Sequence, residues 1–210
     1  ALRENSAIMD TVLAVQKPVV YASSTVVHWE STAPYVRSRR EDEQRLSESG
    51  IPYTIIRPSA PYGPKLRVHS PKHKESFHTL IDVIRKFPFV PVIGNGQYRR
   101  QPVHVDDLSK AIIGLLEVKT LANDGFDIGG AKAYTFVEII DVIQKQLNLN
   151  KKCVFIPKKA MAFGAKFVNN LEPSLINAID EDEVANPRKI INYLGWEPRD
   201  FSLGLKDLLS

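Results

Sequence analysis

The sequence predicts an α/β protein built around a parallel sheet. Three observations lead to this fold class: helix-like and strand-like patterns alternate along the chain, two short runs are apolar on both faces, and one helical pattern separates those runs. A strand that is apolar on both faces is typical of a parallel sheet covered by helices. A helix between two such strands predicts a parallel pair joined by a right-handed crossover.

The chain opens with the first helix and the first strand. Residues 4–16 carry apolar side chains near a 3.6-residue period, which predicts a helix. Pro18 ends this pattern because proline has no amide hydrogen to continue a helix. Residues 19–23 follow as the first strand that is apolar on both faces.

The crossover helix and the second strand come next. Pro34 stands at a position that suits the first turn of a helix, and the charged pattern of residues 35–48 predicts that helix. Gly50 is typical of a helix end. Residues 51–56 then form the second buried strand, which completes a β-α-β unit.

The rest of the chain continues the alternation. Asp106 and Asp107 are interpreted as the N-cap and first turn of a helix over residues 108–118. Thr135 is interpreted as the cap of a helix that runs to Leu147. Further helices are expected over residues 76–87 and 158–170, and a final helix is expected to follow Pro198 and end at Leu209. Short strands are expected over residues 125–130 and 151–157, with an apolar run over 89–93 and a solvated acidic turn over 180–183.

Composition places the chain among globular proteins. With 210 residues, of which 43% are hydrophobic and 25% charged, it can bury one sizeable core. No run of about eighteen apolar residues occurs, so we expect no membrane span. The N-terminal residues lack the features of a signal peptide, which favours a cytoplasmic protein. Cys153 is the single cysteine, which excludes an internal disulfide, and its apolar flank predicts plain burial.

Basic residues gather in two places. The formal charge is +4, and outside residues 37–40 and 65–74 the lysines and arginines are scattered. No recognised nucleic-acid-binding motif accompanies these clusters, so we predict a small-molecule substrate and no nucleic-acid partner. His69, His73 and His78 do not form a known metal-ligand pattern, so we expect a solvated substrate loop and no metal site.

A candidate catalytic group follows the first strand. Ser23 and Ser24 end that strand, and Tyr35 opens the helix after it. Arg39 stands four positions beyond Tyr35, and residues with this spacing lie side by side on a helix. A phenol needs a neighbouring cation to exchange protons near neutral pH. We therefore predict that Arg39 favours the phenolate of Tyr35, and that Ser24 hydrogen-bonds the reacting oxygen.

Two further segments fit a ligand site. Residues 57–64, RPSAPYGP, form a rigid loop after the second strand, at the carboxyl edge where ligands bind in open α/β folds. Residues 98–107 contain Arg100, whose forked guanidinium suits bidentate contacts with phosphate oxygens.

Taken together, these segments resemble the short-chain dehydrogenase/reductase superfamily, in its extended or atypical branch that includes the NAD-dependent epimerase/dehydratase proteins. That family pairs a strand-end serine or threonine with a Tyr-x-x-x-Lys helix. The serine match falls on Ser24, with Ser23 as the less favoured register, and the tyrosine match falls on Tyr35. Arg39 stands where the family has lysine, and a planar guanidinium is not interchangeable with an ammonium.

The resemblance implies a fold, a cofactor and residue roles. The fold is a Rossmann-like doubly wound parallel sheet with a small α/β substrate-binding lobe, and the cofactor is NAD or NADP. Residues 1–64 would be the C-terminal part of the dinucleotide-binding domain, and residues 65–210 would mix core segments with the substrate-binding lobe. A homodimer is also implied. The cofactor-binding residues would be Tyr35, Arg39, Arg57, Pro58 and Ser59, and the substrate-binding residues would be Ser24, Tyr62 and Arg100.

The glycine-rich fingerprint of dinucleotide-binding proteins is missing. Neither G-x-G-x-x-G nor G-x-x-G-x-x-G occurs in these 210 residues. The half that holds adenosine and pyrophosphate in the family is therefore not in this sequence, which fits a fragment, a cleaved upstream part or a truncated relative. Two functions follow: an NAD(P)-dependent epimerase, dehydratase or reductase acting on a nucleotide-sugar-like or other small hydroxyl or carbonyl substrate, or a non-catalytic cofactor-sensing or scaffold relative.

Overall fold

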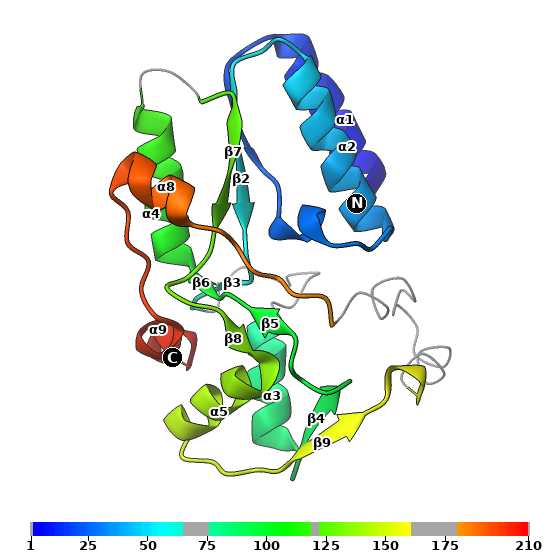
Figure 1. The fold of residues 1–210 in the computed structure, drawn as a ribbon, viewed down its shortest axis with the longest axis vertical. Helices are drawn as coiled ribbons and strands as arrows, with labels where there is room; N and C mark the ends of the chain where they lie inside the picture. The colour runs from blue at the N-terminus through cyan, green and yellow to red at the C-terminus, as the bar shows by residue number, and fades with distance from the viewer. Residues whose placement is uncertain (1, 65–75, 119–121, 161–179, 210) are drawn as a thin grey trace.

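The computed structural model describes residues 2–64, 76–118, 122–160 and 180–209, and it divides into an upper and a lower lobe (Figure 1). No helix within these described ranges is long and apolar enough to cross a membrane. The helix expected over residues 158–170 falls largely outside them, as do His69 and His73.

The upper lobe is built on a three-stranded parallel sheet with helices on both faces (Figure 1). Its strands lie in the order β1-β2-β7, so the predicted parallel pairing of the first two strands is confirmed. The strands are β1 (Val19–Ala22), β2 (Tyr53–Pro58) and β7 (Asp124–Ile128). The helices are α1 (Leu2–Val15) and α2 (Pro34–Glu48) on one side, and α4 (Val105–Glu117) and α8 (Arg188–Leu194) on the other.

The crossover between β1 and β2 depends on a proline at the start of α2 and a glycine after its end. Pro34 is the first residue of α2, where its missing amide hydrogen costs nothing. Gly50 has φ of 73°, a left-handed conformation that lets the chain turn away after the helix. Ile55 and Ile56 are 3% and 2% exposed, so consecutive residues of β2 are buried on opposite faces, as expected of a covered parallel strand.

The lower lobe gathers short strand pairs and three helices around a second core (Figure 1). β4 (Val90–Ile93) pairs with β9 (Cys153–Ile156), β5 (Arg99–Arg100) with β8 (Tyr134–Thr135), and β3 (Pro61–Tyr62) with β6 (Val103–His104). The helices are α3 (Ser76–Lys86), α5 (Phe136–Gln146) and α9 (Phe201–Leu209). Thr135 caps α5 reciprocally with Glu138, as its position in the sequence predicts.

Two local predictions are corrected by the structure. The N-cap of α4 is His104, whose Nδ1 accepts a hydrogen bond from the backbone N–H of Asp106 at 3.2 Å. Asp106 and Asp107 lie in the first turn, where carboxylates complement the helix dipole. Cys153 is half-buried rather than fully buried. The helix α8 has no counterpart among the expected elements.

The acidic segment of residues 180–183 begins as the expected turn and exposes Asp182, but Glu183 is not solvated as we expected. The segment runs as a strap across the junction of the two lobes, and Glu183 forms a parallel bridge with Arg100. The Glu183 side chain is only 16% exposed, and its carboxylate accepts a hydrogen bond from the backbone N–H of Ala60 at 2.9 Å. The indole N–H of Trp29 donates to the Asp182 carbonyl oxygen at 2.9 Å. The strap therefore contacts both lobes.

Candidate functional site

Both serines lie at the carboxyl end of β1. Ser24 is the N-cap of a short 3-10 helix over Thr25–His28, and its Oγ accepts a hydrogen bond from the backbone N–H of Val26 at 3.4 Å. Ser23 is 8% exposed, and its Oγ has no hydrogen-bond partner among the described residues. Thr25 fastens this turn to β2, because its hydroxyl donates to the Pro58 carbonyl oxygen at 3.3 Å.

Tyr35 and Arg39 lie next to one another on the first turns of α2, as the four-residue spacing predicts. The guanidinium carbon of Arg39 is 5.2 Å from the centroid of the Tyr35 ring, within the range of a cation–π contact. Tyr35 is half-buried and packs against the cluster of Val26, Ala33 and Val36, of which Val26 belongs to the 3-10 helix that Ser24 caps. The structure thus brings Tyr35 to the turn that Ser24 caps.

The shortest contact of Arg39 is with a residue that the sequence did not single out. Its Nη1 donates to the hydroxyl of Tyr21 at 2.7 Å and to the Ala22 carbonyl oxygen at 3.4 Å. Tyr21 in turn donates to the carboxylate of Asp42 at 2.8 Å. Burial, with the Asp42 hydrogen bond, raises the pKa of Tyr21 to about 12, so this phenol stays protonated. Arg39 Nε is buried and without a partner among the described residues.

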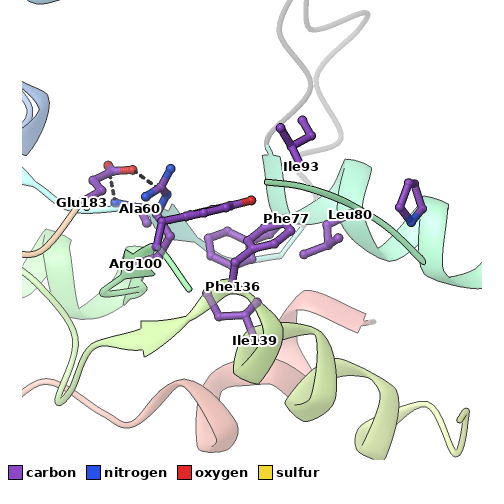
Figure 2. A pocket seen from close by; sticks show the side chains of 10 residues that line it. Ala60, Phe77, Leu80, Ile93, Arg100, Phe136, Ile139 and Glu183 are labelled. Carbon is purple, nitrogen blue, oxygen red and sulfur yellow. Dashed lines mark hydrogen bonds and ion pairs between the residues drawn. The ribbon is translucent and has the colours of Figure 1, made fainter. Parts of the chain in front are cut away.

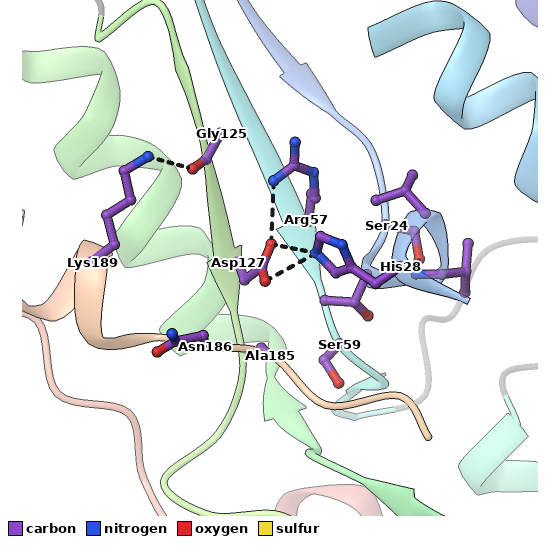
Figure 3. A network of polar contacts seen from close by, with 12 residues as sticks. Ser24, His28, Arg57, Ser59, Gly125, Asp127, Ala185, Asn186 and Lys189 are labelled. Atoms are coloured by element: carbon purple, nitrogen blue, oxygen red, sulfur yellow. Dashed lines mark hydrogen bonds and ion pairs between the residues drawn. The ribbon is translucent and has the colours of Figure 1, made fainter. Parts of the chain in front are cut away.

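Arg57 joins three elements of the upper lobe, and Figure 3 shows its contact with Asp127. Its guanidinium contacts the Glu43 carboxylate at 2.7 to 3.1 Å and the Asp127 carboxylate at 3.4 Å. Nε2 of His28 lies 3.1 Å from both oxygens of Asp127. Burial alone would raise the pKa of Asp127, but His28 and Arg57 outweigh it and lower that pKa. No local pattern could have revealed this network, because α2, β2 and β7 meet only in the fold.

β2 ends at the half-buried Pro58, and Ser59 follows in the interior of the protein, so the structure does not bring Ser59 to a surface that a cofactor reaches. Ser59 has no exposed surface, and its hydroxyl donates to the Glu183 carbonyl oxygen at 2.7 Å. Tyr62 is likewise fully buried, with its ring against Phe77 and Phe201 in the lower core. The structure therefore does not bring Tyr62 to a surface that a substrate reaches.

Arg100 lies at the junction of the lobes and is paired within the chain. Its Nε is 3.5 Å from the Glu183 carboxylate, and its Nη1 donates to the Glu181 carbonyl oxygen at 2.5 Å. The guanidinium carbon lies 4.9 Å from the centroid of the Tyr98 ring. The Arg100 side chain is 13% exposed. A phosphate group at Arg100 would therefore have to compete with Glu183.

The arrangement at the end of β1 suits proton exchange with a ligand oxygen. A phenol, a hydroxyl and a guanidinium come from one turn and the helix that follows it, at the carboxyl edge of a parallel sheet. A parallel sheet with helices on both faces defines a doubly wound α/β protein, and in open sheets of this class ligands bind at the carboxyl edge of the strands.

Comparison with known proteins gives the family. Residues 15–129 match the NAD dependent epimerase/dehydratase family, more than half of the chain, and the chain belongs to that family. It is 26% identical over 191 residues to the NADH-ubiquinone oxidoreductase 40 kDa subunit of Neurospora crassa, covering 87% of this chain and 48% of that protein. It is 29% identical over 195 residues to the chloroplast stem-loop binding protein of 41 kDa b of Arabidopsis thaliana, covering 90% and 48%.

Solved structures confirm the fold predicted from the sequence. The UDP-glucuronic acid 4-epimerase of Bacillus cereus, in complex with UDP-glucuronic acid and NAD, superposes with a TM-score of 0.73 at 19% identity. The match covers 97% of this chain and 65% of that one. The chain therefore spans about half the length of these curated relatives and about two thirds of this enzyme.

Proposed function

We propose that the protein to which this chain belongs is an NAD(P)-dependent enzyme of the extended short-chain dehydrogenase type. Its substrate would be a small molecule with a hydroxyl or carbonyl group at the reacting carbon. One observation carries the proposal: Tyr35 and Arg39 lie together beside the turn capped by Ser24, at the carboxyl edge of the sheet. The family membership of residues 15–129 supports it.

Each of these side chains has a distinct task in the proposed reaction. NAD(P), when bound, would supply or accept the hydride. Tyr35 would exchange a proton with the substrate oxygen, and Ser24 would hold that oxygen by a hydrogen bond. Arg39 would stabilise negative charge on Tyr35, which a cation at this distance does electrostatically.

The residues present fit a cofactor at this edge. Arg39 Nε and Ser23 Oγ are buried polar groups that lack a hydrogen-bond partner among the described residues. An unpaired buried polar group costs about 1–3 kcal/mol, and a ligand with hydroxyl groups would remove that cost. We propose that Arg39 takes over the contact with the nicotinamide ribose that the family's lysine makes.

A non-catalytic relative is the second candidate, and a specific observation favours it. Arg39 donates its shortest hydrogen bond to Tyr21, which is tied to Asp42, rather than to Tyr35. This network would keep α2 on the sheet without any chemistry. Similarity to a subunit named for NADH-ubiquinone oxidoreductase agrees with a cofactor-binding scaffold within a larger assembly.

Calorimetric titration with NADH and NADPH separates the two candidates. It should use this chain and, where its gene encodes one, a version extended upstream. Turnover is followed by nicotinamide absorbance, with NAD+ or NADP+ for UDP-glucuronic acid, UDP-glucose and a panel of uncharged alcohols, and with NADH or NADPH for uncharged ketones. The enzyme proposal expects Tyr35→Phe to abolish turnover while changing cofactor affinity by less than about threefold.

The matched control is Tyr193→Phe, because Tyr193 is 45% exposed on α8 and lies against Phe126, away from Ser24. Equal turnover in the two variants would show that Tyr35 has no catalytic role. Cofactor binding without turnover of any substrate in the panel would favour the scaffold. Arg39→Lys restores the family's residue and should preserve turnover under the enzyme proposal.

A further inference from the structure

The lower lobe contains a cavity of about 260 Å³ beside the end of β2 (Figure 2). Its walls are largely apolar and partly aromatic, and they include Phe77, Leu80, Ile93, Phe136 and Ile139. Phe136 stacks on Tyr98, with ring centroids 5.0 Å apart and planes 24° from parallel, so one wall is a flat aromatic surface. Such a wall favours a flat ring as its ligand.

The only charged residues lining the cavity, within the part of the chain that the structure describes, are Arg100 and Glu183. They neutralise one another, with 3.5 Å between Arg100 Nε and Glu183 Oε2. Figure 2 shows the Glu183 carboxylate directed at Arg100 and at the backbone of Ala60. Neither side chain is more than 16% exposed, so water screens the pair poorly.

Because Arg100 and Glu183 form an ion pair, the cavity should bind uncharged ligands better than anions. Arg100 Nη1 also donates to the carbonyl oxygens of Glu181 and Arg99, at 2.5 and 3.0 Å, so this donor is engaged by the chain itself. A diphosphate placed against Arg100 would approach the Glu183 carboxylate and be repelled by it. An uncharged ring would meet apolar walls and leave the ion pair in place.

We propose that this cavity binds an uncharged, largely apolar ring system, and that a nucleotide diphosphate is excluded by Glu183. A cavity of about 150 Å³ is known to hold benzene, so 260 Å³ admits a flat ring system of about ten heavy atoms. The inference rests on the proposed function, because the ring would be part of the substrate of the proposed NAD(P)-dependent reaction. It replaces the phosphate-binding role predicted for Arg100.

Binding of 2-naphthol and of UDP to the 210-residue chain tests the proposal without cofactor or turnover. Titration is followed by calorimetry and by NMR of isoleucine methyl groups, where Ile93 and Ile139 report on the cavity. We expect 2-naphthol to shift these two methyl signals and to bind at least tenfold more tightly than UDP. UDP binding tighter than 2-naphthol, or no binding of 2-naphthol at these methyl groups, would overturn the proposal.

Two variants assign the effect to the cavity and to Glu183. Ile93→Trp fills the cavity and should weaken 2-naphthol at least tenfold, whereas Ile113→Trp, on an exposed face of α4, should not. Glu183→Gln should strengthen UDP at least fivefold and leave 2-naphthol within twofold. An unchanged UDP affinity in Glu183→Gln would show that this carboxylate excludes nothing. The 2-naphthol titration needs neither cofactor nor turnover, so failure here is distinguishable from failure of the proposed reaction.

Discussion

Replacing Arg57 by leucine should destabilise the upper lobe more than any surface charge replacement. The Arg57, Glu43 and Asp127 side chains are 19%, 13% and 15% exposed, so the substitution leaves two carboxylates together in a poorly solvated place. Two unit charges about 4 Å apart attract by about 4 kcal/mol at an effective dielectric constant of about 20. Removing one partner of a buried ion pair costs about 3–5 kcal/mol, which agrees with this attraction energy.

The pH dependence of the loss has a definite sign. In the native chain the lowered pKa of Asp127 means that its carboxylate stabilises the fold above about pH 4. This contribution disappears as the pH falls through the lowered value. Without Arg57 the pKa of Asp127 is lowered less. The difference in unfolding free energy between native chain and Arg57→Leu should therefore stay constant near neutral pH and shrink as the pH falls below about 4.

Urea unfolding followed by circular dichroism measures both effects. The matched control is Arg45→Leu, because Arg45 pairs with Asp10 at the surface, where the two side chains are 38% and 64% exposed. An exposed pair contributes about 0–1 kcal/mol. A loss below about 1 kcal/mol for Arg57→Leu at pH 7, or a loss that grows on acidification, would refute the reasoning.

Three further substitutions test separate parts of the fold. Gly204→Ala should lower stability by about 1–3 kcal/mol in thermal unfolding, because the new Cβ would lie 2.2 Å from the Tyr62 hydroxyl, and an unaltered midpoint would contradict the packing described. Thr135→Ala removes the α5 cap and should cost about 1 kcal/mol in urea unfolding, with Thr135→Ser recovering most of it. Tyr21→Phe leaves the buried Asp42 carboxylate without its phenol donor and should cost about 1–3 kcal/mol at pH 7, so equal unfolding midpoints would show that this hydrogen bond is dispensable.

Features of the structure that a local sequence pattern determines could be predicted from the sequence. The β-α-β unit follows from two doubly apolar strands and a proline-started helix, and the contact between Tyr35 and Arg39 follows from helical spacing. Parallel pairing with β7 agrees with the expected α/β class as well. These features need no knowledge of the distant parts of the chain.

The remaining features depend on contacts between distant segments. Asp127 reaches Arg57 and His28 only because β7 pairs with β2. Tyr62 sits in a proline-rich loop that suggested a ligand site, yet Phe201 from the last helix closes over it. The carboxylate of Glu183 looked solvated among its acidic neighbours, and only the fold reveals that it is enclosed.

The strap of residues 180–183 links the residue after β2 to the wall of the lower cavity. One residue, Glu183, accepts the Ser59 hydroxyl through its carbonyl and pairs with Arg100 through its carboxylate, and the adjacent Asp182 holds Trp29. A substitution that frees Glu183 from Arg100 would therefore also loosen the contact of the strap with Ser59, the residue that follows β2.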